Sequence, residues 1–218
     1  RIPMGAGLGG GSSDAAATII GLNCLLQLKW SPAQMAEVGQ SLGSDVPFFL
    51  FAPAACVTGR GETVRPVVVE GARWVVLVNP GFGVNTKWAY QELAATRTSV
   101  RPLSRAQQEL DRQSRMGWAQ LMAAAENDFE APLFPFYPIL GFIKDTLLSL
   151  GAQAALLSGS GATVFGIFHT QEEARQASTK LRRDTSWRIF DIPMGSTALP
   201  HDPFHVGSSS HVSKVSIR

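Results

Sequence analysis

The sequence opens on RIPMGAGLGGGSSDAAA, residues 1–17, in which five glycines stand directly before a run of small residues that favours a helix. Glycines free a loop of side chains, so the backbone N–H groups can bend around an anion. An anion in that place also faces the first turn of the following helix, whose N–H groups point toward it. The stretch therefore predicts a phosphate-binding loop rather than a flexible tether.

Other kinds of glycine-rich loop fit the sequence less well. A Walker A loop requires a lysine before its Ser or Thr, whereas Ser12 and Ser13 follow the glycines directly. Gly5-x-Gly7-x-x-Gly10 matches the dinucleotide-binding fingerprint, but that motif needs a helix returning to a parallel strand, and a second capped helix follows here. A protein-kinase glycine loop joins two strands and comes with signatures such as H-R-D, which the sequence lacks. On composition alone, a loop without any ligand stays open as the alternative.

The composition bounds the class of protein. A chain of 218 residues can form one large domain or two small ones, and 45% hydrophobic with 17% charged residues is typical of a globular protein. A net charge of +2 is too small to indicate a nucleic-acid partner. Pro, Gly or a charge interrupts every apolar stretch before the roughly 20 residues that a membrane helix needs. We therefore expect a small-molecule partner, no nucleic acid and no membrane, with the oligomeric state left open.

The two cysteines, Cys24 and Cys56, lie in apolar surroundings and lack a C-x-x-C spacing. Disulfides and metal sites in small proteins usually come with such spacings or with an even, clustered set of cysteines. We therefore expect two reduced and buried thiols.

Residues 1–71 are interpreted as a loop, two helices and a hairpin, the remainder of an N-terminal domain. Residues 14–28 are small and aliphatic enough to predict a helix buried on most sides. Residues 31–34, Ser-Pro-Ala-Gln, have the composition of a capping box with Pro at the first helical position, and the second helix ends near Gly43. Alternating residues over 55–67 predict a hairpin.

Residues 72–195 are predicted to form a second domain. The expected elements are a strand at 74–78, a helical region at 85–150, strands at 153–157 and 162–168, a helix at 171–182 and a strand at 187–192. This β-α-β-β-α-β order is the split βαβ or ferredoxin-like pattern. Within it, the polar stretch 96–115 is interpreted as a mobile insertion. Residues 196–218 are expected to form a partly disordered tail.

Further motifs follow the glycine loop in order. They are LGSDVPFF (42–49), A-x-x-x-G-x-G-E (55–62), ENDFE (126–130) and SGSGATVF (158–165). Together with P-x-G-x-G-L-G-G-G-S-S-D-A-A (3–16) they closely resemble the superfamily of galactokinase, homoserine kinase, mevalonate kinase and phosphomevalonate kinase. Within that superfamily they look like the family of 4-diphosphocytidyl-2-C-methyl-D-erythritol kinases, over most of the chain up to about His205. The implied fold class is α/β plus α+β, with a superfamily kinase domain followed by a ferredoxin-like domain.

The resemblance implies ATP-dependent phosphorylation of the 2-hydroxyl of 4-diphosphocytidyl-2-C-methyl-D-erythritol, in the non-mevalonate pathway of isoprenoid biosynthesis. The implied partners are ATP, Mg²⁺ and this cytidylylated sugar alcohol. Two alternatives stay open: a sister kinase of the homoserine or mevalonate type, and a non-catalytic nucleotide-binding module. The family also implies a bacterial cytoplasmic enzyme, with the plastid stroma as the alternative location.

Site residues follow from the same resemblance. The ATP-binding residues it implies are Pro3, Met4, Gly5, Ala6, Gly7, Leu8, Gly9, Gly10, Gly11, Ser12 and Ser13. The Ser13 hydroxyl is expected to contact phosphate or Mg²⁺. N-capping of the helix is the alternative for Ser12 and Ser13, and both roles can hold at once. Asp45 is implied as the base that faces the acceptor hydroxyl, and its alternative is the N-cap of a short helix. Gly159, Ser160 and Gly161 are implied near substrate or phosphate, and a tight hairpin turn is their alternative.

Some features of the family are expected elsewhere in the chain. Members place a Lys near the acid and a G-Y-H segment that helps bind cytidine, and both would lie before Arg1. We therefore expect the natural chain to begin upstream, since Lys29 and Lys87 do not fall in matching positions. Residues 126–130 match a family segment, but we expect a polar cluster at a helix end there.

Overall fold

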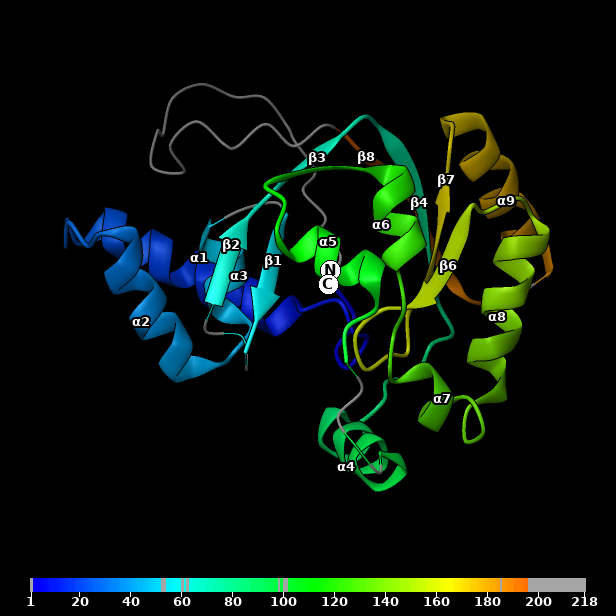
Figure 1. The fold of residues 1–218 in the computed structure, drawn as a ribbon, viewed down its shortest axis with the longest axis horizontal. Coiled ribbons are helices and arrows are strands. Elements are labelled where there is room, and N and C mark those ends of the chain that lie inside the picture. The colour runs from blue at the N-terminus through cyan, green and yellow to red at the C-terminus, as the bar shows by residue number, and fades with distance from the viewer. Residues whose placement is uncertain are drawn as a thin grey trace.

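Figure 1 presents the computed structural model of the protein, which describes residues 2–51, 54–59, 61, 63–97, 99, 102–184 and 186–195. Its helices are α1 (Gly10–Leu25), α2 (Pro32–Leu42), α3 (Val46–Phe51), α4 (Thr86–Thr96), α5 (Arg105–Asp111), α6 (Trp118–Ala124), α7 (Glu130–Leu133), α8 (Pro138–Ser149) and α9 (Gln171–Asp184). Its strands are β1 (Ala55–Thr58), β2 (Thr63–Pro66), β3 (Val68–Glu70), β4 (Arg73–Asn79), β5 (Arg115–Gly117), β6 (Ala154–Leu157), β7 (Val164–Phe168) and β8 (Arg188–Met194). The tail predicted over 196–218 and Glu62 of the second downstream motif lie outside the described residues.

The capping signals at residues 31–34 place the second helix correctly. Ser31 Oγ accepts a hydrogen bond from the Gln34 N–H at 3.3 Å, and Gln34 Oε1 accepts one from the Ser31 N–H at 2.9 Å. These two bonds satisfy donors that the start of an α-helix leaves without partners. Helix α2 then runs to Leu42 and ends before Gly43, as predicted.

Helix α1 differs from its prediction, because it is not buried on most sides. Helices α2 and α3 pack on one side of it, where Ala16 and Ile19 join a small apolar core. The other side carries Leu25, which is 78% exposed, and the exposed Cys24. A continuous apolar run has no readable polar face, so its periodicity cannot separate a helix buried all round from one buried on a single side. The expectation of a buried Cys24 was wrong for the same reason.

The predicted ferredoxin-like sheet is confirmed. Four strands among the described residues pair in the order β6-β7-β4-β8, and every neighbouring pair is antiparallel. In chain order this is 2-3-1-4, the arrangement of the split βαβ pattern. Side chains of β4 alternate between the two faces, as a strand requires. Val76 and Val78 join the core beneath α8 and α9, whereas Val75 and Leu77 join the core on the opposite face.

The opposite face of the sheet is covered by a short parallel pair of strands and a helix. Strand β3 pairs with β5, and Val67, Met116 and Trp118 pack against the sheet from this side. Neither short strand was predicted, since three residues are too few to show an alternating pattern. The pairing places residues 68–70 beside the later part of the chain, and the proposed domain boundary after residue 71 stays a prediction.

The polar stretch 96–115 contains a helix over residues 105–111. Residues 98, 100 and 101 lie outside the described residues, and the mobility expected of the stretch stays a prediction. Helix α5 begins with a second capping box, in which Ser104 Oγ accepts from the Gln107 N–H and Gln107 Oε1 accepts from the Ser104 N–H. An ion pair between Arg105 and Glu109 lies along its exposed side. Capping and i,i+4 pairing stabilise a helix that lacks an apolar stripe.

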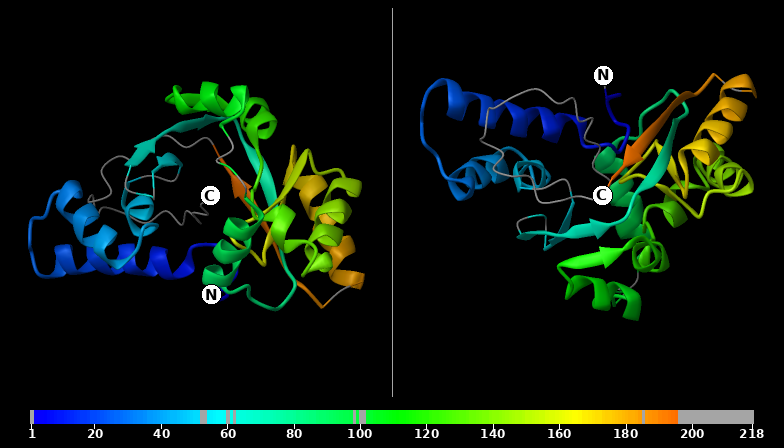
Figure 2. Two further views of the ribbon diagram at one scale, coloured as in Figure 1. Left: turned by 60° about the horizontal axis from the view of Figure 1, so that its bottom comes forward. Right: turned by 90° about the horizontal axis from the view of Figure 1, so that it is seen from above.

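The two halves of the molecule meet at the glycine loop. Figures 1 and 2 show α1, α2 and α3 on one side, and the sheet with α8 and α9 on the other. The start of the chain passes between them in both views of Figure 2. This position puts the loop in contact with segments that lie far from it in the sequence.

Candidate functional site

The glycine loop ends at the N-terminus of α1 without a side-chain cap. Gly9 is the N-cap residue, its φ of +64° lies in the left-handed region, and no side chain caps the helix. The first turn, Gly10 to Ser12, therefore presents backbone N–H groups that an anion can accept from. The helix dipole adds a partial positive charge at the same end. This arrangement is chemically suited to phosphate.

The two serines predicted to bind ATP lie within the first turns of α1. Helix α1 starts at Gly10, so Gly9 holds the N-cap position and the N-capping interpretation of Ser12 and Ser13 was wrong. The Ser13 hydroxyl donates to the Gly10 carbonyl oxygen at 2.8 Å. Its hydrogen is therefore engaged, while its oxygen lone pairs remain able to accept a hydrogen bond or meet a cation.

The glycine loop is held in contact with the turn between β6 and β7. Ser158 Oγ donates to the Gly7 carbonyl oxygen at 2.8 Å, and the Thr163 N–H donates to the Ala6 carbonyl oxygen at 3.1 Å. On the other side of the loop, the Val84 N–H donates to the Gly5 carbonyl oxygen at 3.1 Å. Carbonyl groups of the loop are thus bonded to the second half of the molecule.

The turn itself is longer than the tight hairpin considered for residues 159–161. Residues 158–163 join the two strands, and the Ser158 N–H closes the turn on the Thr163 carbonyl oxygen at 2.8 Å. Asn79, at the end of β4, donates from Nδ2 to Thr163 Oγ1 at 3.1 Å. The hydroxyls of Ser160 and Thr86 lie 3.2 Å apart, with Ser160 buried. The turn is therefore fixed from several elements.

Asp45 lies directly before α3 and is half-buried. The Ser44 hydroxyl donates to Asp45 Oδ1 at 3.2 Å. Gly61 of the β1–β2 turn packs closely on Ser44, because a β-carbon on Gly61 would lie 2.4 Å from the Ser44 carbonyl oxygen. Phe49 of α3 reaches the glycine loop, since a β-carbon on Gly9 would lie 2.7 Å from its ring. Helix α3 thus links the Asp45 segment to the loop. The position of Asp45 directly before α3 suits both interpretations of this residue, as the base and as the N-cap of α3.

Residues 126–130 do more than form a polar cluster at a helix end. Asn127 donates from Nδ2 to the carbonyl oxygens of Leu157 and Gly159, at 2.8 Å each. Asp128 pairs with Arg97 at the end of α4. Sequence reasoning missed the contacts to the turn, and the ENDFE match was the signal that pointed to this segment.

The described residues contain no ready-made metal centre. The part of the chain that the structure describes contains no group of three or more His, Cys, Asp or Glu side chains able to hold a metal ion. Magnesium commonly binds proteins through one or two side chains and completes its shell with phosphate oxygens and water. Ser13 and a bound triphosphate would fit that mode, so the donor set here suits a cation brought by a nucleotide.

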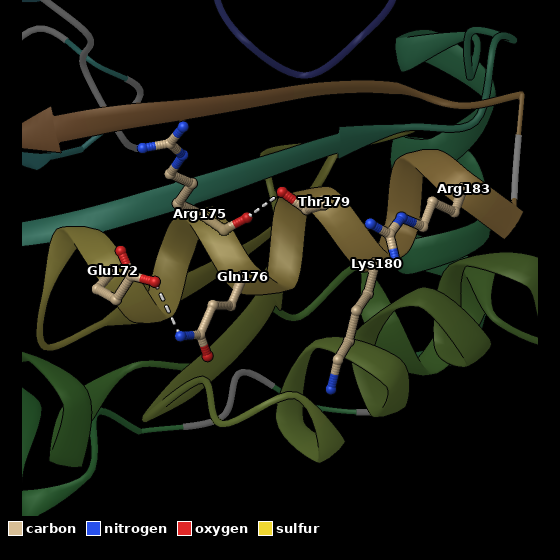
Figure 3. Close-up of a pocket in the computed structure, with 6 residues that line it drawn as sticks. All are labelled: Glu172, Arg175, Gln176, Thr179, Lys180 and Arg183. Atoms are coloured by element: carbon tan, nitrogen blue, oxygen red, sulfur yellow. Dashed lines mark hydrogen bonds between the residues drawn. The ribbon is translucent and has the colours of Figure 1, made fainter.

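A separate surface hollow lies along α9. Its lining residues are Glu172, Arg175, Gln176, Thr179, Lys180 and Arg183. Figure 3 shows them along one exposed side of that helix, with Glu172 bonded to Gln176. Because a single helix supplies all of them, the hollow shares no residue with the loop and the turn.

Of the helices that the structure describes, none is long and apolar enough to span a membrane.

Comparison with known protein families gives two matches in chain order. The family described as GHMP kinases N terminal domain matches residues 1–52, which include the loop, α1 and Asp45. The family described as GHMP kinases C terminal matches residues 106–185, which include residues 126–130 and the β6–β7 turn.

Two curated relatives carry the same enzyme name. A Syntrophotalea carbinolica protein named 4-diphosphocytidyl-2-C-methyl-D-erythritol kinase is 42% identical over 194 residues, covering 88% of this chain and 66% of that protein. A protein of the same name from Syntrophus aciditrophicus is 40% identical over 195 residues, covering 88% and 67%. The chain thus spans about two thirds of the length of these relatives.

Solved structures of the same fold include two named kinases. A crystal structure of 4-(cytidine 5'-diphospho)-2C-methyl-D-erythritol kinase is 31% identical with a TM-score of 0.69, covering 90% of this chain and 69% of that one. Homoserine kinase from Cytophaga hutchinsonii also has a TM-score of 0.69, at 20% identity, covering 90% and 68%. At that identity the likeness concerns the fold alone.

Proposed function

The chain belongs to the family of 4-diphosphocytidyl-2-C-methyl-D-erythritol kinases, within the GHMP kinases. We propose that the protein transfers a phosphoryl group from ATP to the 2-hydroxyl of 4-diphosphocytidyl-2-C-methyl-D-erythritol. This reaction belongs to the non-mevalonate pathway of isoprenoid biosynthesis. The named relatives are bacterial, which supports the cytoplasmic location that we also propose.

One observation carries the proposal. The N-terminus of α1 has no side-chain cap, and the glycine loop that precedes it is hydrogen-bonded to the second half of the molecule. The loop carbonyls of Gly7 and Ala6 are bonded to Ser158 and Thr163. With the carbonyls held in this way, the N–H groups of the first turn of α1 stay directed at a ligand. Phosphoryl transfer depends chiefly on such positioning and on neutralising phosphate charge.

Asp45 is the residue that we propose as the base. In the reaction the substrate 2-hydroxyl oxygen forms a bond to the γ-phosphorus of ATP, and the bond from that phosphorus to the β–γ bridging oxygen breaks. The hydroxyl proton passes to a carboxylate, and ADP leaves with the electron pair of the broken bond. Residues 3–13 would hold the ATP phosphates, and Gly159 to Gly161 would border the phosphates and the acceptor.

We assign the Mg²⁺ that accompanies ATP to the start of α1. When bound, Mg²⁺ neutralises phosphate charge that develops during transfer. Ser13 is the side chain that we propose as its ligand, because its hydroxyl hydrogen is turned to the Gly10 carbonyl and its oxygen is left to accept.

The proposal is tested by presenting three acceptors, with ATP and Mg²⁺, to the full-length product of the gene that encodes this chain: 4-diphosphocytidyl-2-C-methyl-D-erythritol, homoserine and mevalonate. ADP release is followed by a coupled assay, and the phosphorylated product is identified by mass spectrometry. We expect turnover of the cytidylylated acceptor alone. Turnover of homoserine or mevalonate instead would overturn the substrate assignment and favour a sister kinase.

A parallel titration with a non-hydrolysable ATP analogue separates binding from turnover. The same assays are run on residues 1–218 alone. Nucleotide binding without turnover in both forms would show a nucleotide-binding module rather than a kinase. Absence of nucleotide binding in both forms would contradict the whole proposal.

A further inference from the structure

We infer that Asn127 and Glu130 are positioning residues, which hold the turn at residues 158–163 in the place where it closes the glycine loop. Both side chains are hydrogen-bonded to backbone groups where β6 ends and the turn begins. The consequence for nucleotide binding rests on the proposed function, whereas the consequence for the turn does not.

The amide of Asn127 bridges two carbonyl groups at the entrance to the turn. Its Nδ2 donates to Leu157 O and to Gly159 O at 2.8 Å each, while its Oδ1 accepts from the Phe129 N–H at 2.9 Å. The two donated bonds span the position where β6 ends and the turn begins. An amide is the one neutral side-chain group that offers two hydrogens from one nitrogen and an acceptor besides. Each of these capacities is used here.

Glu130 fixes the same point from its other side. Glu130 Oε1 accepts from the Leu157 N–H at 2.9 Å, and Oε2 forms an ion pair with Lys144 of α8. The carboxylate side chain is 15% exposed and the lysine side chain 25% exposed, so water screens the pair only partly. Leu157 is thus bonded at its N–H by Glu130 and at its carbonyl by Asn127. Both of its backbone groups are held by side chains of one five-residue motif.

The fixed turn then acts on the loop through Ser158, the next residue in the chain. Its hydroxyl donates to the Gly7 carbonyl at 2.8 Å, and its own carbonyl oxygen lies 1.9 Å from the position that a β-carbon on Gly7 would occupy. A contact this close has little room for adjustment, because packed backbone atoms cannot interpenetrate. A shift of the turn would therefore move Gly7 or release it. The path runs from residues 127–130 through residues 157–158 to the loop.

Asn127→Asp is the sharpest variant, because it separates the two uses of the side chain. An aspartate keeps an oxygen for the Phe129 N–H but places a second oxygen against two carbonyls, where the amide nitrogen had donated. Asn23→Asp is the matched control. Asn23 is a buried asparagine of α1 whose Oδ1 accepts from the Trp30 N–H and whose Nδ2 donates to the Trp30 carbonyl. It bonds neither the turn nor the loop.

Amide hydrogen exchange tests the effect on the turn without any ligand. We expect Asn127→Asp to raise exchange at least fivefold in peptides covering residues 158–163 and 4–9, and Asn23→Asp to leave both unchanged. Equal protection of these peptides in Asn127→Asp and in the unmodified chain would overturn the inference. Because no nucleotide is used, this result is independent of the proposed function.

Titration with a non-hydrolysable ATP analogue and Mg²⁺ tests the effect on binding. We expect about a tenfold weaker Kd in Asn127→Asp, and a change below twofold in Asn23→Asp even where its thermal unfolding temperature falls equally. Equal losses of affinity in the two variants would show a merely structural role. If neither the unmodified chain nor the full-length gene product binds nucleotide, the proposed function fails, and the exchange experiment still decides the inference.

Glu130→Gln supplies a second variant in case Asn127→Asp does not fold. Glutamine keeps an oxygen for the Leu157 N–H and loses only the ion pair with Lys144. We expect exchange in residues 158–163 to rise, by less than in Asn127→Asp. Lys144→Met should reproduce this rise, since it breaks the same pair from α8. No rise in either variant would remove Glu130 from the positioning role.

Discussion

A β-carbon on Gly7 would lie 1.9 Å from the carbonyl oxygen of Ser158, although the two residues are 151 positions apart in the sequence. The Ser158 hydroxyl is bonded to the Gly7 carbonyl as well. The glycine loop at one end of the chain and the turn near the other end are thus in direct contact. At position 7 this contact leaves room for glycine only. Closure of the site follows from this contact, and each half of the molecule contributes one side of it.

Gly7→Ala should therefore break the junction. The residue has a φ of +72°, which costs an alanine about 1–2 kcal/mol, and the methyl group would overlap the Ser158 carbonyl. We expect the free energy of unfolding to fall by at least about 2 kcal/mol and nucleotide affinity to be lost. Urea denaturation and calorimetric titration measure the two effects. A variant with unchanged stability would mean that the loop and the turn do not meet in solution.

Gly21→Ala is expected to have the opposite effect. Gly21 lies inside α1, and a β-carbon there meets no atom within 4 Å. Alanine in a helix interior is favoured over glycine by about 0.5–1 kcal/mol. The free energy of unfolding should rise by this amount with nucleotide affinity unchanged. A fall in stability would show that another segment covers this side of α1.

The sequence predicted the parts of the fold that have strong local signals. Ser31 and Gln34 mark the start of α2 through their own hydrogen bonds, and the sheet order follows from the order of strands and helices along the chain. The exposed side of α1 could not be predicted, since burial depends on which elements surround a helix. The same holds for β3 and β5, which are strands only because they pair with each other.

The site was predictable to a similar degree. The glycines indicated an anion loop by themselves, whereas Asp45 and the turn at 159–161 were implied only by the family resemblance. The hydrogen bonds of 2.8 Å from Asn127 to the carbonyl oxygens of Leu157 and Gly159 join segments about thirty residues apart. No local sequence pattern encodes such bonds. The roles of the glycine loop, Asp45 and the turn in binding and catalysis remain predictions.

Asp45→Asn should abolish most turnover while nucleotide still binds. An amide cannot take the proton of the acceptor hydroxyl, and general-base catalysis typically contributes 10²–10⁴-fold. We expect kcat to fall by at least about 10², with the Kd for a non-hydrolysable ATP analogue changed less than threefold. Asp145→Asn, an exposed carboxylate of α8, is the control and should match the unmodified protein. An unchanged kcat in Asp45→Asn would leave Asp45 as the N-cap of α3.

The two cysteines should differ in their reaction with iodoacetamide. Cys24 is exposed, whereas Cys56 is half-buried and its Sγ lies 3.3 Å from Asp111 Oδ1. Burial, followed by the hydrogen bond and the negative charge of Asp111, raises the pKa of the Cys56 thiol. The thiolate is the reactive form, so a raised pKa leaves less of it at a given pH. At pH 8 we expect Cys24 to be alkylated at least tenfold faster.

Asp111→Asn tests the cause of that difference. Removing the carboxylate removes the repulsion that a thiolate at Cys56 meets, so its pKa should fall toward the ordinary value, and burial should keep it from reaching that value. Alkylation of Cys56 should then accelerate at pH 8, while the rate at Cys24 stays the same. Rates are measured for each site by mass spectrometry of peptides across a pH series. An identical Cys56 profile in both proteins would show that Asp111 does not control the reactivity of the thiol.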